Sequence, residues 1–133
     1  MNSAATNTGA LPVLLIEDEP AVMAYVKAAL ERGGYAVQTC ESGAKALPLL
    51  ESAEFLGVVS DMGSSGGLDG GQLHAWIARH RPQLAARVVF ITGDIADEEN
   101  VATLRQTGAP CVEKPFRLRQ FIAVVERTLG RSQ

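Results

Sequence analysis

Acidic side chains follow two apolar segments of this 133-residue chain. The run 17–19, Glu-Asp-Glu, comes directly after the apolar residues 13–16, and Asp61 comes directly after the segment 55–60. Carboxylates at such positions can bind a hard cation, act as nucleophiles or cap a helix. The chemistry therefore depends on whether these groups meet in space.

Two later apolar segments also end in polar residues. Thr92 follows 87–91, and Lys114-Pro115 follows 110–113. Taken singly, each polar group has a common structural role: an acid at 17–19 could cap the next helix, Asp61 could cap its loop, and a lysine is usually solvated. If all four segments are parallel strands of one sheet, however, these groups share one edge, where such sheets bind ligands.

Convergence of the acids would be energetically costly. If Glu17, Asp18 and Asp61 lie within about 5 Å of each other, each like-charge pair costs roughly 3 kcal/mol at an effective dielectric of about 20. Three such pairs are comparable with the whole stability of a domain, about 5 to 15 kcal/mol. A cation must offset them, and oxygen ligands without His or Cys favour Mg2+ over zinc.

The elements that must position these groups alternate along the chain. Apolar runs predict strands at 13–16, 35–40, 55–60, 87–91 and 110–113. Amphipathic runs predict a helix after each strand: one from Pro20 to the glycines at 33–34, one capped by Ser42 and kinked or shortened by Pro48, and others at 72–80, 97–107 and 118–129. This alternation predicts an α/β fold, a doubly wound five-stranded parallel sheet with five flanking helices.

Composition narrows the classes of protein. The chain is 47% hydrophobic and 20% charged with a net charge of −3, which is typical of one globular domain. No apolar run is long enough to span a membrane, the start lacks a secretory signal, and the scattered basic residues do not indicate nucleic-acid binding. We therefore expect a cytoplasmic protein in which Cys40 and Cys111 are reduced core thiols.

Four motifs carry a family resemblance. "LLIEDEP", "VVSDM", "VVFITGD" and "CVEKPF" occur in this order between residues 11 and about 129, and the combination resembles a response regulator receiver domain of two-component signalling. The resemblance implies a flavodoxin-like strand order 2-1-3-4-5. It also implies a receiver domain at 11–130, followed by a short tail at 131–133. The small, polar residues at 1–10 predict a disordered tail before the domain.

The resemblance implies a role for each polar residue at the predicted edge. Asp61 would be the phosphoacceptor, Asp18 a direct Mg2+ ligand and Glu17 a ligand through water, with the Gly63 backbone carbonyl completing the protein ligands. Thr92 would move to meet the phosphoryl group, Lys114 would pair with it, and Pro115 would follow a cis bond. Gly93 and Asp94 would border the phosphoryl group, where Gly93 leaves an open approach for water and implies a short phosphoryl lifetime; Asp94 could instead cap the next helix.

The implied function is that of a signalling phosphoacceptor rather than an enzyme. A sensor histidine kinase would donate the phosphoryl group from a phosphohistidine, and the fourth helix, fifth strand and fifth helix would signal or relay to a downstream phosphotransfer or target protein. Only four residues follow the last predicted helix, so we expect a stand-alone receiver, a monomer or weak homodimer. Two alternatives stay open: a phosphate-independent interaction module and a Mg2+-dependent phosphohydrolase.

The chain departs from the family pattern in two places. Ser64-Ser65 replace a common Met-Pro pair, in a lengthened loop at 63–71. Cys111 stands where many receivers have Tyr or Phe, and "GAPCVEKPF" resembles the receivers of hybrid histidine kinases. The first departure concerns the loop beside the predicted phosphoacceptor.

Overall fold

The structure, a computed structural model, describes residues 11–63 and 68–130, so the predicted tails at 1–10 and 131–133 lie outside the described residues. The strands are β1 (Val13–Ile16), β2 (Val37–Cys40), β3 (Gly57–Asp61), β4 (Val88–Thr92) and β5 (Cys111–Glu113). The helices are α2 (Pro20–Arg32), α3 (Gly43–Ser52), α4 (Gly70–His80), α5 (Pro82–Ala85), α6 (Glu98–Thr107) and α7 (Leu118–Leu129).

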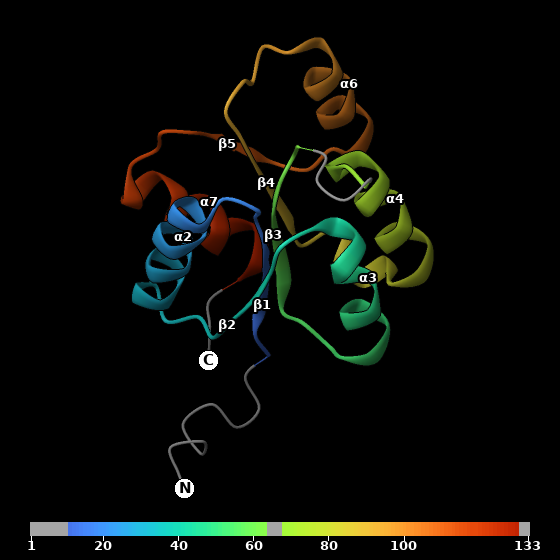
Figure 1. The fold of residues 1–133 in the computed structure, drawn as a ribbon, viewed down its shortest axis with the longest axis horizontal. Coiled ribbons are helices and arrows are strands. Elements are labelled where there is room, and N and C mark those ends of the chain that lie inside the picture. Colours follow the sequence, from blue (N-terminus) through green and yellow to red (C-terminus); the bar gives the residue numbers. More distant parts are fainter. Residues whose placement is uncertain (1–10, 64–67, 131–133) are drawn as a thin grey trace, which may run out of the picture.

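All five strands pair in parallel, in the order β2-β1-β3-β4-β5. The chain places β2 on one side of β1 and then continues on the other side with β3, so the order reverses between β1 and β3 (Figure 1). Doubly wound sheets bind their ligands outside the carboxyl ends of the strands at such a reversal. The predicted fold class and strand order are confirmed.

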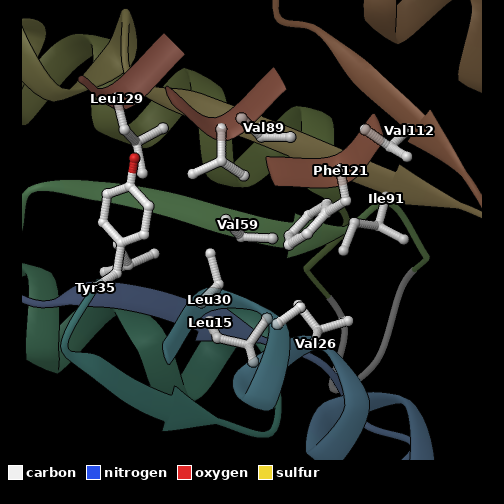
Figure 2. Close-up of a cluster of buried hydrophobic side chains, with 13 residues drawn as sticks. Leu15, Val26, Leu30, Tyr35, Val59, Val89, Ile91, Val112, Phe121 and Leu129 are labelled. Carbon is white, nitrogen blue, oxygen red and sulfur yellow. The ribbon is translucent and has the colours of Figure 1, made fainter. Parts of the chain in front are cut away.

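The helices cover both faces of the sheet, with α2 and α7 on one face and α3, α4 and α6 on the other (Figure 1). Successive strand residues point to opposite faces, and both faces are apolar. Val13 and Leu15 join the core on the side of α2 and α7, whereas Leu14 and Ile16 join the core on the side of α3 and α4. Figure 2 shows Leu15 in the first of these cores. Burial on both faces explains why the inner strands β1, β3 and β4 read as continuous apolar runs, whereas the edge strand β2 has exposed polar residues.

The predicted stripe on the last helix is confirmed. Phe121, Val125 and Leu129 are buried, and Leu118 and Ile122 pack against the same core. These positions share one face of the helix because their spacing follows its period of 3.6 residues. The stripe thus fixes α7 against the sheet.

The structure refines several predicted boundaries. Arg81 ends α4 as expected, but Pro82 then starts the single-turn helix α5, a sixth helix among the described residues. Tyr35 precedes β2 instead of opening it, although its ring is buried in the core. Residue Pro48 lies inside α3, which continues to Ser52.

Local sequence signals account for most of the helix starts. Ser42 caps α3 as predicted, and Asp69 caps α4 in a reciprocal arrangement with Gln72. In contrast, Glu19 occupies the N-cap of α2 without a side-chain capping bond. Glu19 therefore takes the predicted N-cap position but does not cap α2 through its side chain. None of the helices in the described ranges is both long and apolar enough to cross a membrane.

Candidate functional site

Three carboxylates meet at the carboxyl edge of the sheet. Glu17 and Asp18 follow β1, and Asp61 is the last residue of the neighbouring strand β3. One carboxylate oxygen from each lies within 4.8 Å of the others. The predicted convergence is confirmed, and it arises because parallel pairing brings the ends of β1 and β3 side by side.

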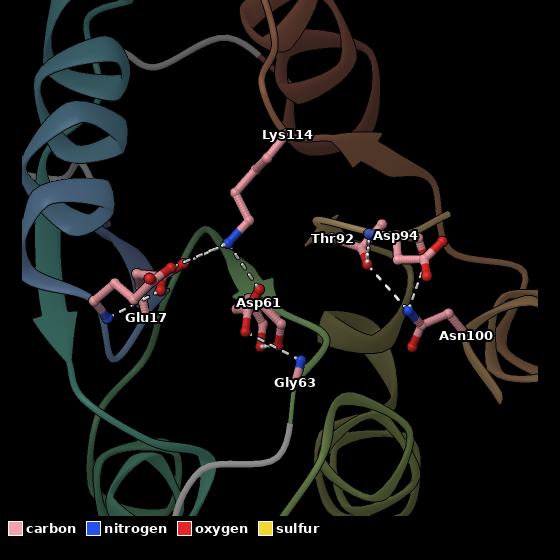
Figure 3. Close-up of polar contacts among 9 residues, drawn as sticks. Glu17, Asp61, Gly63, Thr92, Asp94, Asn100 and Lys114 are labelled. Carbon is pink, nitrogen blue, oxygen red and sulfur yellow. Dashed lines mark hydrogen bonds and ion pairs between the residues drawn. The ribbon is translucent and has the colours of Figure 1, made fainter. Parts of the chain in front are cut away.

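Lys114 reaches into this cluster from the end of β5 (Figure 3). Its Nζ lies 3.2 Å from Asp61 Oδ1, 3.7 Å from Glu17 Oε1 and 3.8 Å from Glu19 Oε1. The Lys114–Pro115 peptide bond is cis, as the sequence resemblance implied. The ammonium group offsets part of the negative charge that the carboxylates bring together.

Glu17 is the most enclosed of the acids, with a side chain only 1% exposed. Its Oε2 accepts a hydrogen bond of 3.0 Å from the Glu19 backbone N–H, whereas Oε1 is buried without a hydrogen-bond partner. Burial, helped by the nearby Asp61 carboxylate, raises the pKa of Glu17 above its ordinary value of 4.5. A buried carboxylate oxygen without a partner is costly, and a bound cation would remove that cost.

The Lys114 ammonium experiences two opposing effects. Burial lowers the pKa of Lys114, but the Asp61 and Glu17 carboxylates outweigh burial, and the resulting pKa lies above the ordinary value of 10.5. Lys114 therefore stays positively charged at neutral pH. It is suited to pairing with an anion bound beside Asp61.

Gly63 contacts the second carboxylate oxygen of Asp61. Its backbone N–H donates a hydrogen bond of 3.1 Å to Asp61 Oδ2. A Cβ atom at residue 63 would lie only 2.8 Å from the same oxygen, so glycine permits this close approach. Residues 64–67 of the lengthened loop lie outside the described residues, and the metal-binding role of the Gly63 carbonyl stays a prediction.

Thr92 ends β4 next to the cluster, but its hydroxyl interacts on the side away from it. Oγ1 accepts hydrogen bonds of 3.1 Å from the Asp94 backbone N–H and from Asn100 Nδ2 (Figure 3). Sequence reasoning did not single out Asn100, because a polar residue in the first turn of a helix is unremarkable. The contact depends on the position of α6.

Two expectations from the sequence concern Gly93 and Asp94, the residues that follow Thr92. Asp97, not Asp94, caps α6, so the capping alternative for Asp94 is wrong; Asp94 Oδ1 instead accepts from the Ala96 N–H. A Cβ atom on Gly93 would meet nothing within 4 Å, which agrees with an open approach for water.

Burial raises the pKa of the Cys111 thiol to about 11, as expected of an unreactive thiol.

The donor set fits a hard divalent cation. All three side chains offer carboxylate oxygens, one of which has no hydrogen-bond partner, and no His or Cys belongs to the cluster. A separate cavity of about 480 Å³ is lined by Leu11, Phe55, Arg81 and Arg87, among others. None of the three clustered acids lines this cavity. We therefore take the acidic edge as the candidate site.

Comparisons with known proteins agree on one family. The family described as "Response regulator receiver domain" matches residues 13–126. Response regulator protein FleR of Pseudomonas aeruginosa is 34% identical over 89% of this chain, which spans 24% of FleR. Response regulator receiver protein CpdR of Brucella abortus is 30% identical over 88% of this chain and 95% of its own length. This chain thus spans about a quarter of one relative and nearly all of the other.

Solved structures share the fold. The receiver domain of NtrX from Brucella abortus has a TM-score of 0.78 and 29% identity, covering 88% of this chain and 97% of that one. The receiver domain of a sensor histidine kinase from Pseudomonas aeruginosa, solved with magnesium coordinated in its active-site cleft, has a TM-score of 0.79. It is 21% identical, with coverage of 90% and 98%, and this likeness concerns the fold alone.

Proposed function

The chain belongs to the response regulator receiver domains, and from this membership we propose that Asp61 accepts a phosphoryl group from the phosphohistidine of a sensor histidine kinase. The observation that carries the proposal is the position of Asp61. It ends a buried central strand within 4.8 Å of two other carboxylates and 3.2 Å from the Lys114 ammonium. A rigid carboxylate with a cation beside it suits phosphoryl transfer, which requires in-line positioning and charge neutralisation.

The transfer step follows from this arrangement. A carboxylate oxygen of Asp61 attacks the phosphorus in line with the phosphorus–nitrogen bond of the donor. That bond breaks, the electron pair leaves with the imidazole, and an aspartyl phosphate forms. Lys114 pairs with the phosphoryl oxygens, and Gly63 leaves room beside the carboxylate for the donor to approach.

We propose Mg2+ as the resident cation. Asp18 and Asp61 would bind it directly, Glu17 would bind through water, and the Gly63 carbonyl would complete the protein ligands. When bound, the ion would neutralise negative charge on the carboxylates and the phosphoryl group. The support is the oxygen-only donor set, together with the buried Glu17 Oε1 that has no hydrogen-bond partner.

The response to phosphorylation would travel through Thr92 and Pro115 to the surface of α6, β5 and α7. Thr92 would turn toward the phosphoryl group, and Gly93 and Asp94 would control the access of water to it. The partners would be the kinase and a downstream phosphotransfer or target protein, in the cytoplasm. We propose a relay or a phosphate sink rather than a persistent switch.

The experiment is incubation with Mg2+ and a small acyl phosphate, followed by intact mass spectrometry. We expect one added phosphoryl group on the native protein and none on Asp61→Asn. The control is Asp97→Asn, which removes a carboxylate but keeps the α6 cap, since Asn caps as well as Asp. Phosphorylation of Asp61→Asn at the native rate would overturn the assignment.

The same measurement separates the two alternatives. A phosphohydrolase would consume the acyl phosphate without accumulating an adduct, but such enzymes usually have a second acid two residues after the nucleophile, where this chain has Gly63. An interaction module that does not use phosphate would show neither adduct nor turnover.

A further inference from the structure

We propose that Asn100 is a positioning residue that holds the Thr92 hydroxyl in its resting orientation and couples phosphorylation of Asp61 to the first turn of α6. This inference rests on the proposed function, because Thr92 is taken to move toward a phosphoryl group on Asp61. It adds a residue outside the acidic cluster and a physical link between the site and a helix.

The geometry fixes the orientation of the Asn100 amide. One of its end atoms lies 2.8 Å from the Asp94 carbonyl oxygen and 3.1 Å from Thr92 Oγ1. A carbonyl can only accept, so this atom is the Nδ2 amino group, and the Thr92 oxygen is its second acceptor (Figure 3). Asn100 therefore joins the Thr92 side chain and the Asp94 backbone to α6.

These contacts hold Thr92 on the side of α6. Its oxygen accepts from both the Asp94 N–H and Asn100 Nδ2, which uses both of its acceptor positions. The residue is only 3% exposed, so water has little access to replace a lost donor. Turning toward Asp61 thus requires the bond from Asn100 to break, and this bond opposes the active orientation.

The link to α6 follows from where Asn100 lies. Its backbone N–H donates to the capping carboxylate of Asp97 at 3.1 Å, so the side chain belongs to the first turn of the helix. No side chain of α6 is fully buried, whereas the other long helices each bury at least three residues. The position of a helix with so little buried surface depends more on its hydrogen bonds to the rest of the protein. Movement of Thr92 away from Asn100 removes one of these hydrogen bonds.

The closing experiment compares Asn100→Ala and Asn100→Leu, which is close to Asn in size but can neither donate to Thr92 nor accept from it, with the native protein. The control is Glu99→Ala, an exposed residue of the same turn. One readout is the rate of adduct formation with Mg2+ and acetyl phosphate. The other is the backbone amide NMR spectrum of the unphosphorylated protein, compared with the spectrum of the native protein carrying the beryllofluoride mimic of the phosphoryl group.

If Asn100 restrains Thr92, both Asn100 variants form the adduct about fivefold faster, as expected from losing one neutral hydrogen bond. Their unphosphorylated amide signals at 93–97 and in α6 shift toward the positions of the mimic-bound native protein. Glu99→Ala changes neither readout. In a Thr92→Val background, which lacks the hydroxyl, the Asn100 substitutions have no further effect.

Two results would overturn the coupling alone. Native rates and unshifted amides in both Asn100 variants would show that the contact restrains nothing. An undiminished effect in the Thr92→Val background would show that Asn100 acts through Asp94 instead. Failure of the proposed function is distinct, because the native protein itself would then gain no phosphoryl group, and the coupling would fall with it.

Discussion

At the scale of single residues, Glu17 combines burial, negative charge and an oxygen without a hydrogen-bond partner. Such a group is normally neutralised or bound to a cation. Lys114 supplies part of the compensation at 3.7 Å, and the proposed Mg2+ would supply the rest. The metal-free protein should therefore carry a stability cost at this residue.

We predict that Glu17→Gln stabilises the metal-free protein at neutral pH by on the order of 1 kcal/mol. This is only a fraction of the roughly 3 kcal/mol of repulsion in one like-charge pair, because Lys114 already offsets part of that repulsion. The pKa of Glu17 is raised in the folded state. The destabilisation caused by its ionised carboxylate is therefore absent below the ordinary pKa of 4.5 and develops as the pH rises through the pKa of the folded state. Urea unfolding across this range, without Mg2+, measures the difference. An advantage for Gln that is equal at acid and neutral pH would contradict this origin.

A second residue-scale prediction concerns the lifetime of the phosphoryl group. Gly93 has open space where a side chain would begin, and its φ is not among the positive values, so a larger residue fits without strain. We expect Gly93→Met to slow loss of the phosphoryl group several-fold by obstructing water, with Gly93→Ala intermediate. Decay of the adduct after removal of the acyl phosphate, followed by intact mass, tests this order. A native adduct that lasts many hours with Mg2+ would contradict the relay proposal.

At the scale of elements, the central strand β3 and the last helix α7 pack closely at Gly57. Gly57 opens β3, and a Cβ atom there would lie 2.6 Å from Leu129 Cδ2 and 2.8 Å from the Arg87 carbonyl oxygen. The backbone oxygen belongs to the neighbouring chain segment and cannot turn away as a side chain could. The glycine therefore permits the contact between the central strand and the last helix.

We predict that Gly57→Ala lowers the free energy of unfolding by about 1 to 3 kcal/mol, the usual cost of overpacking a core. The matched control is Gly93→Ala, where the added methyl group meets nothing within 4 Å. Urea unfolding of both variants gives the comparison. Equal stability of the two would mean that α7 moves aside without cost.

At the scale of the whole molecule, metal binding should be visible as stability. A ligand that binds only the folded state stabilises it by about 2.7 kcal/mol at 100 times its Kd. We expect Mg2+ to raise the melting temperature of the native protein and to have much less effect on Asp18→Asn. Sodium chloride at matched ionic strength controls for general screening of charge. An equal rise with both salts would argue against a specific Mg2+ site.

The sequence by itself determined the fold class and the candidate site. Continuous apolar runs indicated the inner strands β1, β3 and β4, because helices cover both faces of a doubly wound parallel sheet and leave these strands no polar face. The residues at the ends of the predicted strands, among them the acids at 17–18, Asp61 and Lys114, were then expected to lie together. Parallel strands present their carboxyl ends at one edge of the sheet. These inferences need only local pattern and topology, which the chain carries in its order.

Only the tertiary structure decided which groups share hydrogen bonds and which are left without partners. Whether Asp94 or Asp97 caps α6, and whether Asn100 reaches Thr92, depends on how the helix sits on the sheet. The buried Glu17 Oε1 likewise results from the packing of distant segments around it. Hydrogen bonds require atoms to lie within about 3 Å at suitable angles, and the spacing of residues along the chain does not fix such distances.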